Sequence, residues 1–175
     1  HVVAMDGVCI IVHPSNPVRN LTREQIRKMY TGQIKNWSEV GGPNREIIKI
    51  NRDSASGTFE TFEGLVLNKE KAGGDVETVS SNPQMYNRVK STQGAIGYVG
   101  LGFLDNNVKA IMVDGVSPTR RTIASGVYPV SRPLYLFTDG YPKLGSAVHA
   151  FCTFHLSEKG QMLVEEKGFV PVTDY

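Results

Sequence analysis

Short β-branched runs alternate with capped helical patterns along this chain, and that alternation is what most limits its fold. Residues 7–13 form an apolar run closed by Pro14, and Thr22 is placed to cap a helix that continues to Tyr30. The same signals predict further strands at 47–51, 76–79, 94–100, 108–113 and 132–138 and further helices at 57–67, 83–90, 119–125, 144–156 and 157–167. Alternating elements of this kind predict the α/β class, with a largely parallel or mixed sheet.

Length and charge limit the domain count and the class of partner. The chain has 175 residues, which suits one domain or one and a half. Its 19 basic and 17 acidic residues give a net charge of +2, which is too balanced to favour nucleic acid. No apolar stretch is long enough to span a membrane. No signal peptide is visible at His1, so we expect that a signal was removed or that the chain is an excised piece.

The two cysteines, Cys9 and Cys152, lie far apart in the sequence. A disulfide is compatible with this spacing, but two buried free thiols are the commoner arrangement and the one we expect.

The most informative segment is a strand, a loop and a helix that together suggest an anion site. Arg52 ends the strand, and Ser56 is in the position that caps the helix. A capped helix start presents unpaired amides, here those of Gly57, Thr58 and Phe59, at the positive end of the helix dipole. Gly57 lets an oxygen approach the backbone, and the hydroxyls of Ser56 and Thr58 add donors. With the guanidinium of Arg52, these groups indicate a site for a tetrahedral oxyanion.

Magnitudes support this interpretation without deciding it. A hydrogen bond to a charged group contributes roughly 1.5–3 kcal/mol, whereas the helix dipole alone contributes about 0.3–1 kcal/mol. Several bonds from Arg52 and the Ser56-Gly57-Thr58 segment would therefore support a tight site. The spacing alone is equally compatible with a plain helix cap beside a solvated arginine.

Further motifs accompany this loop in a fixed order. They are Asp6-Gly7-Val8, Asn16-Pro17, Leu21-Thr22, Tyr30-Thr31-Gly32, Asn36-Trp37, Gly41-Gly42, Gly94-Ala95-Ile96-Gly97-Tyr98, Arg132-Pro133-Leu134-Tyr135 and Ser157 with Gly160-Gln161. Together with the anion loop, they resemble the phosphate-binding solute receptors of bacterial ABC transporters, in the type II periplasmic binding protein superfamily. The match runs along nearly the whole chain.

The resemblance implies a periplasmic-binding-protein-like fold, in which two α/β lobes joined by crossover strands hold the ligand in a cleft. Residues 1–13 would be a hinge or crossover strand, and residues 14–130 the second lobe with the anion loop. Residues 131–175 would be a return strand and the C-terminal helices of an incomplete first lobe.

The resemblance also implies a function and a location. The chain would bind inorganic phosphate, or a similar tetrahedral oxyanion, through Arg52, Ser56, Gly57 and Thr58. It would do so outside the cytoplasm and deliver the ion to the membrane subunits of an ABC transporter, without a cofactor and without catalysis.

The chain departs from the family at its N-terminus. Family members begin with a further segment that builds most of the first lobe and carries an acidic residue facing the ligand. Phosphate retains a proton near neutral pH, so a phosphate-selective site needs an acceptor, whereas sulfate does not. The best visible acceptor is Asp53, unless it pairs with Arg52. Without the segment we expect weak binding, apolar surface exposed on the hinge strands and last two helices, and self-association through that surface.

Other constellations are weaker. His149, Cys152 and His155 lie three residues apart on an expected helix, and their drift around it keeps them from one metal ion. No Gly-Lys-Ser/Thr phosphate loop is present. Two alternatives to the receptor remain open, namely a serine hydrolase that uses Ser56 and a stand-alone signalling or structural lobe. The hydrolase would need a histidine base, and no histidine in the chain has a motif around it.

Overall fold

The computed structural model describes residues 1–173 and confirms the α/β class with a mixed sheet. Within these residues the main sheet has six strands, in the order β4-β3-β5-β1-β6, and β8 also pairs with β1. β3 is parallel to β4 and β5, whereas β1 is antiparallel to β5, β6 and β8. The strands are β1 (Val2–Val12), β3 (Ile48–Arg52), β4 (Glu77–Val79), β5 (Ala95–Gly100), β6 (Lys109–Ala110) and β8 (Ser131–Tyr135).

The predicted helices all occur, with shifted ends. They are α1 (Arg23–Tyr30), α2 (Gly57–Leu65), α3 (Asn82–Ser91), α4 (Arg120–Ala124), α5 (Ala147–Phe154) and α6 (Glu158–Glu166). Each is capped by a serine or threonine side chain that accepts a hydrogen bond from a first-turn amide. Two short 3-10 helices, η1 (Trp37–Val40) and η2 (Leu101–Phe103), lie in segments without a helical signal.

The prediction of one strand over residues 108–113 is wrong. The segment is divided between β6, which pairs with β1, and β7 (Met112–Val113), which pairs in parallel with β2 (Asn20–Leu21) in a separate two-stranded sheet. The change occurs at Ile111, whose amide still donates to the Ile10 carbonyl, while the amide of Met112 donates to Arg19. The apolar run is therefore continuous in the sequence, although its two halves pair with different strands.

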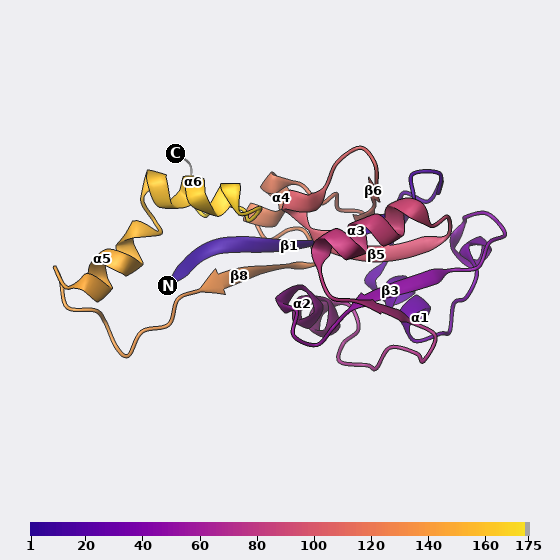
Figure 1. Ribbon diagram of the computed structural model, residues 1–175, viewed down its shortest axis with the longest axis horizontal. Helices are drawn as coiled ribbons and strands as arrows, with labels where there is room; N and C mark the ends of the chain where they lie inside the picture. The colour runs from indigo at the N-terminus through magenta and orange to yellow at the C-terminus, as the bar shows by residue number, and fades with distance from the viewer. Residues whose placement is uncertain (174–175) are drawn as a thin grey trace.

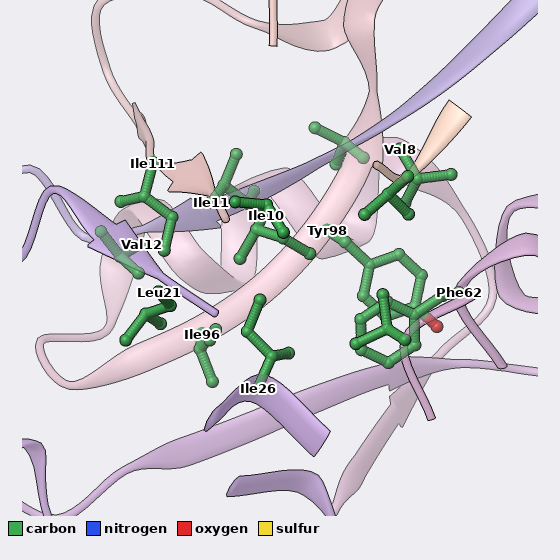
Figure 2. Close-up of a cluster of buried hydrophobic side chains, with 14 of the residues drawn as sticks. Val8, Ile10, Ile11, Val12, Leu21, Ile26, Phe62, Ile96, Tyr98 and Ile111 are labelled. Carbon is green, nitrogen blue, oxygen red and sulfur yellow. The ribbon is translucent and has the colours of Figure 1, made fainter. Parts of the chain in front are cut away.

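The hydrophobic core lies where the middle of the sheet packs against α1, α2 and α3. Val8 to Val12 of β1 are fully buried because neighbouring strands and helices cover them. Figure 2 shows Val8, Ile10, Ile11 and Val12 in one cluster with Phe62 and Tyr98, with Val8 near the two rings. Burying one large apolar side chain contributes roughly 1.5–3 kcal/mol, so this cluster is a major source of stability.

The chain has two regions of different character. We call residues 8–130 the body and residues 136–169, which include α5 and α6, the arm. β1 and β8 run side by side from the body toward the far end of the molecule, where α5 and α6 lie (Figure 1). β1 begins at Val2, before the buried apolar run of residues 7–13, because its first half pairs with β8 and bridges to Val170.

The arm exposes much of its apolar surface, as the sequence predicts. Among the described residues, ten of the fifteen exposed large hydrophobic side chains lie in the arm. These ten are Phe137, Tyr141, Leu144, Val148, Phe151, Phe154, Leu156, Met162, Leu163 and Phe169. The arm therefore presents an apolar face that no other part of residues 1–173 covers.

Cys9 and Cys152 are both free and buried, which confirms the prediction of two free thiols. Among residues 1–173, no helix has both the length and the apolar character needed to cross a membrane.

Candidate anion site

The end of β3 is fixed by a buried polar cluster. The Arg52 amide donates to the Tyr98 hydroxyl at 3.1 Å and to the Asn51 side-chain oxygen at 3.0 Å, and Tyr98 also bonds to Asn51. The Tyr98 ring stacks on Phe62 of α2, with centroids 4.1 Å apart. Because one tyrosine contacts both the strand end and the helix, the loop between them is held at both ends.

The first turn of α2 presents two free amides. Ser56 is the cap, as predicted, and its hydroxyl oxygen accepts from the Phe59 amide at 3.2 Å. The prediction that the Phe59 amide also faces a ligand is therefore wrong, since the cap already uses it. Within the described part of the chain, the amides of Gly57 and Thr58 have no acceptor. These two amides and the hydroxyls of Ser56 and Thr58 are the donors that the helix start offers.

The Arg52 side chain bonds to the start of α3. One terminal nitrogen donates to the Asn82 side-chain oxygen and the other to the Ser80 carbonyl, each at 3.2 Å. Its Nε is buried and has no hydrogen-bond partner. A buried donor without an acceptor is costly, so an oxygen from a ligand would relieve it.

Asp53 is used within the loop. Its side chain accepts from the Ala55 amide at 3.1 Å, and its carbonyl accepts from the Ser56 amide at 3.2 Å. Among the described residues no ion pair joins it to Arg52, so the alternative that these two neighbours pair is not observed. The carboxylate shapes the turn that leads into α2.

The structure adds a second arginine that sequence reasoning did not place here. Arg132 of β8 donates to the Gly57 carbonyl at 2.9 Å and to Glu60 at 3.2 Å. Its Nε lies 3.9 Å from the carboxylate of Asp6, the residue opposite it in the β1–β8 ladder. Arg132 was recognised in the sequence only as part of a strand motif, because 75 residues separate it from Gly57.

Asp6 is an unusual carboxylate. It is only 7% exposed, and burial raises its pKa above the ordinary value, while Arg132 and the Gly7 amide partly offset that effect. Together with the half-buried Arg132, it forms an ion pair between β1 and β8, next to the first turn of α2.

Comparisons with known proteins agree with this geometry. Residues 1–159 match the family described as the PBP superfamily domain, the periplasmic binding proteins. The chain belongs to the PBP superfamily. An ABC-type phosphate transport receptor from Vibrio cholerae has a similar structure, with a TM-score of 0.85 and 34% identity, over 97% of this chain and 71% of that one. The resemblance to phosphate receptors of ABC transporters is thereby confirmed.

Curated relatives within the superfamily are longer than this chain. The phosphate-binding protein PstS of Borreliella burgdorferi is 35% identical over 98% of the chain, and that of Bacillus subtilis is 34% identical over 99%. The chain spans 65% and 58% of their respective lengths. Both relatives are named as binding proteins rather than as enzymes.

Proposed function

We propose that this chain binds inorganic phosphate, or a closely similar tetrahedral oxyanion, at the first turn of α2. The ligand-binding residues are Arg52, Ser56, Gly57 and Thr58. The protein would act as a receptor that delivers the ion to the membrane subunits of an ABC transporter, as the names of its relatives suggest.

The observation that carries this proposal is a set of donors without acceptors, two at the first turn of α2 and one on Arg52 at the end of β3. The amides of Gly57 and Thr58 and the Nε of Arg52 have no partner among the described residues. A tetrahedral oxyanion supplies several acceptor oxygens and a negative charge, which the start of a helix favours. The Ser56 hydroxyl accepts from Phe59 and keeps its own proton to donate.

The test is a titration of the ¹⁵N-labelled chain with phosphate, sulfate and molybdate, followed by amide chemical shifts. We expect phosphate to shift the Gly57 and Thr58 amides first. Arg52→Ala should weaken binding by at least about tenfold, which is ~1.4 kcal/mol. Arg88→Ala is the matched control, because Arg88 pairs with Glu77. No shift with any of the three anions would reject the proposal, and unchanged affinity in Arg52→Ala would remove Arg52 from the site.

The division into lobes is part of the same proposal. Residues 1–13 and the return strand would be the hinge, residues 14–130 one lobe, and residues 131–175 part of the other. The pairing of β1 with β8 and their course from the body to the arm support this division (Figure 1). Closure of two lobes about such strands would bury the ion and present a changed surface to the transporter.

We also propose that the chain is not an enzyme and acts outside the cytoplasm. Ser56 serves as a helix cap, and its recorded hydrogen bonds do not involve a histidine. A serine-reactive probe that labels Ser56 would contradict this part and favour the hydrolase alternative.

Self-association through the arm completes the proposal. Ten exposed large hydrophobic residues on one short segment favour contact with a second copy. Light scattering should show a mean mass that rises with concentration, and Phe137→Ser with Phe151→Ser should lower it toward the monomer. A single monomeric species at all concentrations would contradict this.

A further inference from the structure

The contact between Arg132 and Gly57 acts on the peptide that carries the Thr58 amide. The carbonyl of Gly57 and the N–H of Thr58 belong to one planar peptide unit, so fixing one end fixes the other. Arg132 Nη2 donates to that carbonyl at 2.9 Å, and the Thr61 hydroxyl donates to it at 3.0 Å. A cationic donor on the carbonyl also polarises the unit and makes the opposite N–H a stronger donor.

The same contact depends on residue 57 having no side chain. A Cβ built on Gly57 would lie 2.9 Å from Arg132 Nη2, closer than real Cβ atoms approach other atoms, and nothing else lies within 4 Å of it. Gly57 has an ordinary negative φ, so backbone conformation does not require glycine here. A side chain at position 57 would therefore push the end of Arg132 away from this carbonyl, independently of any approach by a ligand.

Arg132 is itself held from two sides. Asp6 of β1 lies 3.9 Å from its Nε, and Glu60 of α2 accepts from its Nη1 at 3.2 Å. Asp6 is buried, whereas Glu60 is largely exposed and contributes little through so exposed a pair. The better shielded contact is thus the one with Asp6 of β1, the strand that connects the body to the arm. It is an electrostatic contact, because the Arg132 Nε has no hydrogen-bond partner among the described residues.

We propose that Arg132 is a positioning residue for the anion site, which orients and polarises the Gly57–Thr58 peptide from the crossover strands. This inference rests on the proposed binding of phosphate at α2. It assigns to β1 and β8 a direct influence on the ligand-binding amides, because a shift of β8 moves the group that bonds to Gly57. Arg132 need not touch the ion.

The test is a double-mutant cycle of Arg132→Ala and Gly57→Ala, with phosphate affinity measured from the Thr58 amide shift. Arg132→Ala should weaken binding about tenfold, or ~1.4 kcal/mol. Gly57→Ala should weaken binding in the wild-type background because its methyl group displaces Arg132. It should have much less effect in the Arg132→Ala background, where that conflict is absent.

Two controls make the outcome specific. Arg120→Ala removes the same side chain from a pair with Glu165 on α6 and should leave affinity within about twofold of wild type. Thermal unfolding identifies any variant that fails to fold, and Arg132→Gln, which is shorter and neutral, then replaces Arg132→Ala in the cycle.

The possible failures are distinguishable. Independent effects of the two substitutions would overturn the positioning role, since a distant charge would leave the cost of Gly57→Ala unchanged. Normal affinity in Arg132→Ala together with weakened affinity in Arg52→Ala would overturn it while leaving the proposed function in place. An absence of phosphate binding by the wild-type chain would reject the proposed function itself.

Discussion

The body and the arm use similar residues in opposite ways. In the body, most aromatic and β-branched side chains are enclosed, and Phe62 is fully buried against Tyr98. In the arm, Phe137 is 88% exposed and Phe151 is 58% exposed. Side chains of the same type therefore contribute differently to stability in the two regions, because only apolar surface removed from water stabilises the fold.

The two regions also differ in how they are attached. One attachment of the arm to β1 is Gln161 of α6, a buried polar residue whose side-chain amide donates to the Val3 carbonyl at 2.9 Å. Its oxygen accepts from the Val172 amide at 2.7 Å. The body thus depends on packing and the arm on a few hydrogen bonds, which should make the arm the easier region to open.

The difference between the two regions is tested most directly by truncating one phenylalanine in each and measuring the free energy of unfolding. Phe62→Ala should lower the free energy of unfolding by about 3–5 kcal/mol, because it leaves a cavity against Tyr98. Phe151→Ala should change it by no more than about 0.5 kcal/mol, the usual range for surface sites. Urea unfolding measures both. Similar losses in the two variants would show that the arm has a core of its own.

The anchor of the arm can be removed next. Gln161→Ala would leave the Val3 carbonyl and the Val172 amide unsatisfied, at a cost of about 1–3 kcal/mol. Hydrogen exchange should accelerate in α6 and remain unchanged in β5 of the body. Met162→Ala on the same helix is the matched control, since Met162 is exposed. Equal acceleration in the body would contradict the view that the arm opens alone.

The two cysteines give a direct probe of local opening. Cys9 lies on β1 in the body and Cys152 on α5 in the arm, and both are buried. Burial also raises the pKa of Cys9, which keeps it as the unreactive thiol. We expect an alkylating reagent to modify Cys152 at least about tenfold faster, because local opening exposes it. Mass spectrometry of Cys9→Ala and Cys152→Ala assigns the rates, and faster modification of Cys9 would reverse the comparison.

Local signals made much of the fold predictable. Thr22 and Ser56 cap α1 and α2 as expected, because capping depends on a residue and its next three neighbours. The same capping chemistry predicts that the Phe59 amide bonds to the Ser56 side chain and is not free for a ligand. The division of residues 108–113 was not predictable in this way, because it depends on which distant strand each half meets.

Only the local part of the candidate site was predictable from the sequence. The donors at Gly57 and Thr58 follow from their place after the cap. The partners of the arginines do not, because Arg52 bonds to Asn82, 30 residues away, and Arg132 bonds to Gly57 across 75. Sequence order gives no information on such contacts until the register of β1 and β8 is known.

A smaller effect, on the pH dependence of stability, is expected at Asp6 of β1. Burial raises its pKa, so the folded state holds the proton more tightly than the unfolded state. Stability therefore falls as pH rises from about 4 through that pKa, because ionised Asp6 is disfavoured in the fold. Asp6→Asn removes this titration, so the variant should gain on wild type as pH rises toward neutral.

Urea midpoints across the pH range, in phosphate-free buffers of constant ionic strength, measure this difference. Asp105→Asn is the control with opposite sign, because the Tyr86 hydroxyl lowers the pKa of Asp105. Its wild-type carboxylate contributes stability that is lost as pH falls, so this variant should lose ground as pH rises. Parallel curves for wild type and Asp6→Asn would mean that Arg132 fully compensates the burial of Asp6. Asp6 would then be buried without a net electrostatic cost to the folded state.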